Sequence, residues 1–144
     1  PIPATSKKSE VVSYVKAGIS NGANVAFTTR SAFTNPHFFT TNSGINWNIK
    51  KVSLNSAFGL FNVASFELVL EYVAVDTAWA VGSGTILHSE TFTSITKNVA
   101  NNVISGSAIT VAVPNNVNIF AYFKLNSGIY SITDAEIIVQ LEEQ

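Results

Sequence analysis

The clearest pattern in the chain is the alternation of side chains along residues 64–75, ASFELVLEYVAV. One set of alternate positions holds Phe66, Leu68, Leu70, Tyr72 and Ala74, and the other holds Glu67, Val69, Glu71, Val73 and Val75. Since successive side chains of a strand point to opposite faces, the first set predicts a core side and the second a mixed face, partly wet and partly covered. Helical spacing fits worse, because it would place both glutamates on the stripe shared by Leu68 and Tyr72. We therefore expect a central strand of an antiparallel sheet.

Other extended stretches follow, separated by turn residues. Residues 45–54 alternate and then slip by one position at Lys50 and Lys51, which is what a β-bulge produces. Residues 114–116 (Pro-Asn-Asn) and 126–128 (Asn-Ser-Gly) have turn chemistry of the kind that joins antiparallel neighbours. The strands expected are residues 24–29, 45–54, 64–75, 85–95, 108–113, 117–125 and 129–141, and residues 57–62 are expected to continue as strand or bend, interrupted at Gly59.

Two stretches are ambiguous between helix and strand. In residues 11–19 helical spacing competes with a high β-branched content, and we favour a strand. Residues 94–106 allow one short helix, because Ile95, Val99 and Val103 recur at four-residue spacing before a glycine stop at Gly106. Residues 30–44 lack sustained periodicity and are the most loop-like long segment, and Asn21 and Gly22 predict a turn.

These elements predict an all-β fold. About eight to ten short strands with turn signals roughly every 8–12 residues, and no alternation with helices, are typical of a sandwich or barrel. Our first choice is a jelly-roll-type antiparallel β-sandwich of about eight strands. It would form a single domain over residues 11–144, behind an N-terminal arm at residues 1–10. An immunoglobulin-like sandwich is the second choice, since it usually needs fewer residues and its Cys-Trp-Cys landmark is missing.

The amino-acid composition indicates a surface with few charged side chains. Charged residues make up 12% of the 144 residues, about half the usual share, and Asn, Ser and Thr replace them. A surface of neutral polar groups favours an oligomer or larger assembly over a free monomer. The net charge is −1 and the basic residues are scattered, so a nucleic-acid partner is not expected. No apolar run approaches about 20 residues and no signal peptide is visible, so no membrane partner is expected either.

No residue pattern predicts catalysis, a metal or a cofactor. The only histidines, His37 and His88, lack any accompanying nucleophile signature, and there is no cysteine. Glu67 and Glu71 would lie about 13 Å apart on a strand, too far for a glycosidase pair unaided, so we expect them to solvate one face or pair with lysines across it. Residues 82–84, Gly-Ser-Gly, form a lone Gly-x-Gly without the features of a phosphate cradle.

Aromatic residues are the remaining candidates for contact with a ligand or subunit. Rings beside amide and hydroxyl side chains are typical of carbohydrate-binding sandwiches, so a glycan ligand stays open. The favoured alternative places the two tryptophans in the core and uses the phenylalanines to close one end of the sandwich or to contact a subunit. The candidates are Phe33, Phe38, Phe39, Trp47 and Trp79.

Three features give the chain a resemblance to the small jelly-roll structural proteins of virions, the capsid, decoration and fibre-type subunits of bacterial viruses. They are the arm with Lys7 and Lys8, the Asn-, Thr- and Phe-rich residues 30–44, and low-charge strands such as residues 117–125. The resemblance implies a non-enzymatic protein of the virion, made in the host cytoplasm, that associates with copies of itself and with other capsid proteins. The arm lacks the strong basic charge of genome-packaging coat proteins, so no genome-binding role is expected.

Overall fold

The computed structural model describes residues 7–20, 24–29, 39–40, 46–97 and 102–144, and these residues form strands, turns and irregular segments with no helix among them. The strands are β1 (Ser9–Ser20), β2 (Asn24–Ala26), β3 (Thr28–Thr29), β4 (Phe39–Thr40), β5 (Trp47–Ala74), β6 (Thr85–Lys97), β7 (Asn102–Ser105), β8 (Val111–Ala112) and β9 (Val117–Glu143). Three predictions fall wholly or largely outside the described residues. They are the turn at Asn21 and Gly22, most of the loop over residues 30–44, and residues 1–6 of the expected arm. Ser9 and Glu10 already belong to β1.

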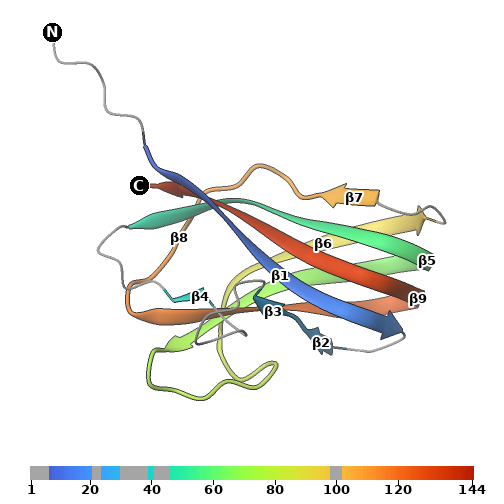
Figure 1. The fold of residues 1–144 in the computed structure, drawn as a ribbon, viewed down its shortest axis with the longest axis horizontal. Coiled ribbons are helices and arrows are strands. Elements are labelled where there is room, and N and C mark those ends of the chain that lie inside the picture. Colours follow the sequence, from blue (N-terminus) through green and yellow to red (C-terminus); the bar gives the residue numbers. More distant parts are fainter. Residues whose placement is uncertain (1–6, 21–23, 30–38, 41–45, 98–101) are drawn as a thin grey trace, which may run out of the picture.

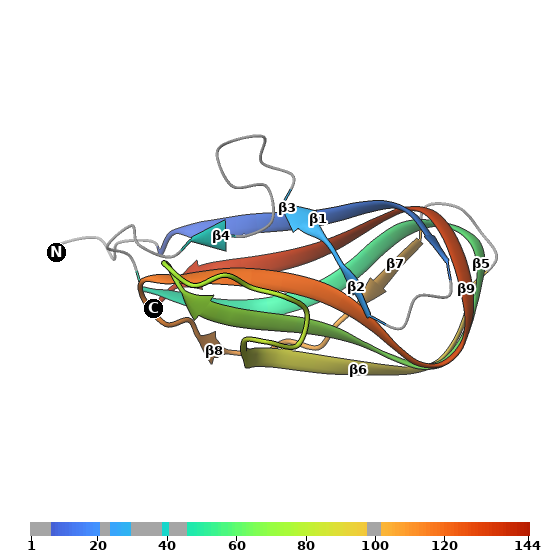
Figure 2. The ribbon, with the colours of Figure 1, turned by 90° about the horizontal axis from the view of Figure 1, so that it is seen from below.

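Two long strands, β5 and β9, organise the fold. They pair antiparallel along their whole lengths, from Trp47 opposite Glu143 to Ala74 opposite Val117. Near their midpoints both strands bend together and pass from one layer of the sandwich to the other, as the curved end in Figure 2 shows. The first half of β5 therefore pairs with the second half of β9, and the second half of β5 with the first half of β9.

The remaining strands complete two antiparallel layers (Figure 1). In the first layer the order is β3, β1, second half of β9, first half of β5, then β7 and β8. In the second layer β2 and β4 flank the first half of β9, and β6 flanks the second half of β5. Early strands thus pair with late ones, as when a long two-stranded ribbon is rolled up, which is the jelly-roll arrangement. The predicted jelly-roll-type sandwich is confirmed.

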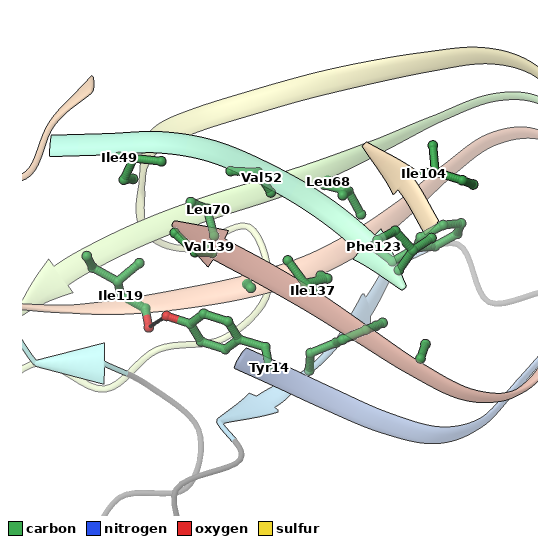
Figure 3. Packing of buried hydrophobic residues seen from close by; sticks show 14 of the residues in the cluster. Tyr14, Ile49, Val52, Leu68, Leu70, Ile104, Ile119, Phe123, Ile137 and Val139 are labelled. Carbon is green, nitrogen blue, oxygen red and sulfur yellow. Dashed lines mark hydrogen bonds between the residues drawn. The ribbon is translucent and has the colours of Figure 1, made fainter. Parts of the chain in front are cut away.

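The core lies between the two layers and is built from one set of alternate positions on each strand (Figure 3). Phe66, Leu68 and Leu70 of the central stretch are fully buried there, as predicted. The Phe66 ring stacks between Phe92 and Phe123, with centroids 4.9 and 5.0 Å away. The Tyr14 hydroxyl donates a hydrogen bond of 2.9 Å to the Ile119 carbonyl and so links the layers through the core. A buried hydroxyl with this partner avoids the cost of an unmet hydrogen bond.

Several local predictions are confirmed. Residues 11–19 belong to strand β1, and residues 85–95 to strand β6. The register of β5 against β9 shifts between Ile49 and Lys51, so the slip of the hydrophobic pattern at this point is a β-bulge. The Lys50 ammonium group donates a hydrogen bond of 2.7 Å to the Thr110 hydroxyl.

The predicted ends of the long strands are wrong. Residues 45–54 and 64–75 were expected as separate strands, with residues 57–62 continuing as strand or bend and broken at Gly59. Instead β5 runs through all three ranges, and register shifts absorb the irregular positions. Likewise β9 runs through residues 126–128, where a turn was expected. Gly128 has a left-handed φ of +120° and still pairs with Val63, so this sequence bends the strand without reversing the chain. Residues 114–116 join β8 to β9, which do not pair with each other.

The short helix predicted over residues 94–106 is also wrong in the described part of that range. Residues 94–97 end β6, residues 102–105 form β7, and residues 98–101 lie outside the described residues. Ile104 is buried in the core while Val103 is 52% exposed, so side chains alternate as in a strand. Pairing of β7 with β5 and the β-branched side chains outweigh the four-residue spacing. The strand expected at residues 108–113 is reduced to Val111–Ala112.

The bend makes a prediction about Gly128. A Cβ atom there would lie 2.6 Å from both the Asn62 carbonyl oxygen and the Val63 Cα, on a backbone that only glycine adopts readily. We expect Gly128→Ala to lower the free energy of unfolding by at least about 2 kcal/mol in urea titrations. Gly82→Ala is the control, because Gly82 has φ +85° with open space around it and should lose about 1 kcal/mol. Equal losses in the two variants would contradict close backbone approach at the bend.

Candidate functional site

Residues 75–84, here called the strap, connect β5 to β6 and cover part of the outer face of the second layer. Phe120 and Tyr122 alternate with core residues of β9 and so lie on this outer face. The Trp79 ring of the strap stacks on Phe120, with centroids 4.2 Å apart and planes 10° apart, and lies 6.5 Å from the Tyr122 ring. The Trp79 side chain is half-buried, and its Nε1 is buried with no hydrogen-bond partner among the described residues. Ring stacking therefore holds this side chain in place.

A buried carboxylate lies under the strap. Glu71 pairs with Phe120 in the β5–β9 ladder and is only 1% exposed. Its Oε1 accepts a hydrogen bond from the Gly82 amide and its Oε2 one from the Gly84 amide, both at 2.8 Å. Such bonds satisfy a charge that would otherwise be costly to bury. The expectation that Glu71 solvates a sheet face is wrong.

The Gly-Ser-Gly sequence therefore does bind an anion, but that anion is the chain's own side chain. Gly82 supplies the left-handed backbone that turns the amides inward, with φ +85°. A Cβ on Gly84 would lie 2.8 Å from the Tyr72 carbonyl oxygen and 3.2 Å from the Glu71 Oε2. Two glycines thus bring the backbone close to the carboxylate, which pins the strap to the sheet. One feature of the sequence pointed to this burial, because Glu71 stands between two valines, Val69 and Val73, on the face expected to be mixed. Both valines are buried in the structure.

The same carboxylate acts on Tyr122. Burial, the negative charge of Glu71 and a side-chain hydrogen bond to Glu71 raise the pKa of Tyr122 to about 12, with a smaller contribution from Glu67. The hydroxyl thus stays neutral and can donate to Glu71. Tyr122 thus lies between the Trp79 ring and the Glu71 carboxylate and interacts with both.

A polar network continues along the outer face of the second layer. Glu67 accepts hydrogen bonds from the Ser89 hydroxyl at 2.7 Å and the Asn126 amide at 3.2 Å, and its Oε2 lies 3.6 Å from the Lys124 Nζ. The hydrogen bond from Ser89 lowers the pKa of Glu67 and outweighs the effect of desolvation. Hydrogen bonds from Asn126 and Lys124, and the positive charge of Lys124, lower this pKa further. The pairing with a lysine across the sheet, expected for Glu67, is observed. Because the pair is partly exposed, its contribution to stability is small.

The one histidine in the described residues, His88, contacts a carboxylate. Its Nε2 lies 3.3 Å from the Glu90 Oε1, and the other oxygen of Glu90 accepts a hydrogen bond of 2.7 Å from the Ser107 amide. The hydrogen bond from Ser107 to Glu90 ties β6 to the segment after β7. His37 lies outside the described residues. In the described part of the chain no three His, Cys, Asp or Glu side chains gather to hold a metal ion.

The structure separates the aromatic candidates. Trp47 is 5% exposed and packs in the core at the start of β5, whereas Trp79 lies outside the core on the second layer. Phe39 begins β4, which pairs with β9 at Ile119. Phe33 and Phe38 lie outside the described residues. Trp79 thus presents a ring on the outer face of the second layer.

Comparisons with known proteins give only distant likenesses. No protein-family model and no curated protein matches the chain. The chain is similar to the structure of Eiger TNF from S. frugiperda, with 11% identity over 93% of this chain and 91% of that chain and a TM-score of 0.45. It is also similar to the K1 cleaved adhesin domain of Lys-gingipain from Porphyromonas gingivalis W83, with 10% identity over 97% and 98% and a TM-score of 0.39. These values identify neither a family nor a ligand.

Within the described residues, no helix has the length and apolar character needed to cross a membrane.

The raised pKa of Tyr122 makes stability depend on alkaline pH. The unfolded chain releases this proton near the ordinary value of 10.0, while the folded chain retains it up to about 12. The stabilising contribution is thus complete below pH 10 and is lost as the pH rises through about 12. We expect the free energy of unfolding to fall less steeply over this range in Tyr122→Phe than in the wild type, in urea titrations at a series of pH values. Identical slopes would show that Tyr122 titrates normally in the folded protein.

Proposed function

We propose that the protein is a non-enzymatic structural subunit of a virion, a capsid or capsid-decorating jelly roll that associates with copies of itself and packs in a shell. The observation that carries the proposal is the character of one sheet face. The outer face of the first layer presents three rows of side chains across β1, β9, β5 and β7. The first row is Val11, Gln140 and Lys51, the second is Ser13, Ile138, Ser53 and Ser105, and the third is Val15, Glu136, Asn55 and Val103.

These rows suit contact with protein better than contact with water alone. Two of the eleven side chains are charged, and the others are small, amide or β-branched. Val11 is 61% exposed and Val103 52% exposed, at opposite edges of the face. Covering such side chains in an interface removes apolar surface from water without burying many charges. The second layer differs, because the strap already covers part of its outer face.

Three acidic groups of the second layer, those of Glu67, Glu71 and Glu90, support a structural role over an enzymatic one. Both oxygens of Glu71 accept backbone amides of the strap, and the oxygens of Glu90 bind His88 and Ser107. Glu67 is likewise engaged by side chains of neighbouring strands. Carboxylates that hold the fold in this way lack the freedom expected of an acid or base acting on a substrate.

Association through the first layer is tested by matched substitutions. Val11 and Ile86 are equally exposed, at 61%, but Val11 lies on the outer face of the first layer and Ile86 on β6 of the second. We expect the wild type to sediment as an oligomer at micromolar concentration and Val11→Lys to shift it toward monomer, because a lysine would be desolvated in the interface. Ile86→Lys should sediment as the wild type does. A monomeric wild type, or equal effects of the two substitutions, would contradict the proposal.

A second candidate function is carbohydrate recognition on the second layer, and the position of Trp79 favours it. The stacked ring adjoins Tyr122, and the hydrogen-bonded Glu67 and Asn126 lie further along the same face. A sugar ring can stack on an aromatic face while amides and carboxylates bind its hydroxyls.

This candidate is tested by fluorescence in Trp47→Phe, where Trp79 is the sole tryptophan. If it is right, cellohexaose, maltohexaose or chitohexaose should change the emission because a sugar ring stacks on the indole. Trp79→Ala, which keeps the buried Trp47, is the control and should show no response to the same sugar. An unchanged emission with all three would exclude 1,4-linked chains of glucose and of N-acetylglucosamine as ligands.

A further inference from the structure

We infer that two copies of this chain join edge to edge at β1, so that their first layers form one continuous antiparallel sheet about a twofold axis at Ser9. This inference rests on the proposed self-association through the first layer and adds the symmetry and register of one contact. It follows from the backbone groups that β1 directs away from β9 and from the charges beside them.

The outer edge of β1 is only partly paired within the described residues. β3 is the one described strand on that side, and it pairs only with Tyr14 and Val15. Residues 9–13 therefore have no described strand beside them, although β9 pairs with each of them on the other side. A strand edge of this kind is a template for pairing with another chain.

Alternate residues of this stretch direct their amides and carbonyls outward. The Glu143 amide donates a hydrogen bond of 2.8 Å to the Lys8 carbonyl, and the register of β1 against β9 continues from this pair without a shift. Hydrogen-bonded and non-hydrogen-bonded pairs alternate along an antiparallel ladder. The amides and carbonyls of Ser9, Val11 and Ser13 thus point away from β9.

Charge and space select the position of the twofold axis. An axis at Lys8 or at Glu10 places that side chain directly opposite its own copy, and like charges in this position are destabilising. An axis at Val11 places Lys8 of one copy beside the partner's Tyr14, where β3 already lies. An axis at Ser9 avoids both conflicts, because Ser9 then lies opposite the partner's Ser9.

This axis pairs opposite charges. Lys8 lies opposite the partner's Glu10, and because a twofold interface is isologous the reciprocal pair forms as well. Both side chains are exposed, and among the described residues neither the Lys8 ammonium group nor the Glu10 carboxylate has a partner. Charges usually keep an edge strand from pairing, but here their signs match across the contact.

The exposed valine of β1 is covered by the same contact. Val11 is 61% exposed and lies opposite the partner's Lys7 in this register. The aliphatic part of a lysine can cover an apolar side chain while its charge stays in water. Val11→Lys would instead place two lysines opposite each other, which agrees with the loss of association expected above.

A proline at the axis tests the backbone pairing. Ser9 is the first residue of β1 and its amide points away from β9, so Ser9→Pro removes an outward donor without breaking the ladder within the chain. It should raise the dissociation constant in sedimentation equilibrium at least about thirtyfold, because two bonds between copies are lost and the ring blocks approach. Ser9→Ala keeps the amide, is the matched control, and should associate as the wild type does.

Charge reversal tests the register. Lys8→Glu and Glu10→Lys, each alone, place like charges at two symmetric contacts, so each should raise the dissociation constant at least about fivefold. An equimolar mixture of the two variants, and the double variant, restore both opposite-charge pairs and should return to within about threefold of the wild type. Lys124→Glu, a reversal on the second layer, should leave association unchanged.

Cross-linking separates edge pairing from stacking of the sheet faces. The chain has no cysteine, so bismaleimidoethane can join only the positions introduced. In the edge-paired dimer the two Ser9 Cα atoms are about 5.5 Å apart, and Ser9→Cys should form a covalent dimer. The two Gln140 Cα atoms, on the same outer face, are then about 20 Å apart, so Gln140→Cys should stay uncoupled.

The outcomes separate this contact from the proposed function. Wild-type-like association of Ser9→Pro, or coupling of Gln140→Cys but not Ser9→Cys, would overturn edge pairing while leaving self-association intact. Single charge reversals without effect, or a mixture that does not recover, would overturn the register. A monomeric wild type would overturn both the contact and the proposed function. Circular dichroism of every variant verifies that the sandwich is folded.

Discussion

Continuous backbone pairing between β5 and β9 is the constraint on which the fold depends. A buried amide or carbonyl without a partner costs free energy, so two strands that pass from one layer to the other do best to bend together and keep their ladder. The register shifts near residues 57–66 absorb the difference in path between the strands. Gly128 allows their backbones to approach at the bend. The other strands then add to either side of this folded ribbon.

The sequence predicted the parts of the fold that depend on local periodicity. Alternation identified Phe66, Leu68 and Leu70 as core, and the phase slip at Lys50 located a bulge. It did not predict strand continuity, because an Asn-Ser-Gly sequence serves equally for a reversal and for a bend. Which one forms depends on whether the neighbouring strand follows the same path, and that is a non-local property.

The candidate site was likewise predicted only in its local features. The aromatic character of Trp79 was visible in the sequence, but its place outside the core depends on the strap folding back over β9. The role of Glu71 was missed because a charged residue in an alternating strand ordinarily faces water. Gly82 and Gly84, more than ten residues later, supply the amides that make its burial tolerable. The first layer has no corresponding strap among the described residues, and this asymmetry distinguishes its two outer faces.

Because β1 pairs with the end of β9, the two ends of the sandwich differ. The Glu143 amide donates a hydrogen bond of 2.8 Å to the Lys8 carbonyl, so the start of β1 and the end of β9 emerge side by side, while the bends of β5 and β9 occupy the far end (Figure 2). A short peptide could join these neighbouring ends, and new ends could be opened in an exposed turn such as the one at Asn115. Such a circularly permuted chain would keep the same sandwich with its entry point moved.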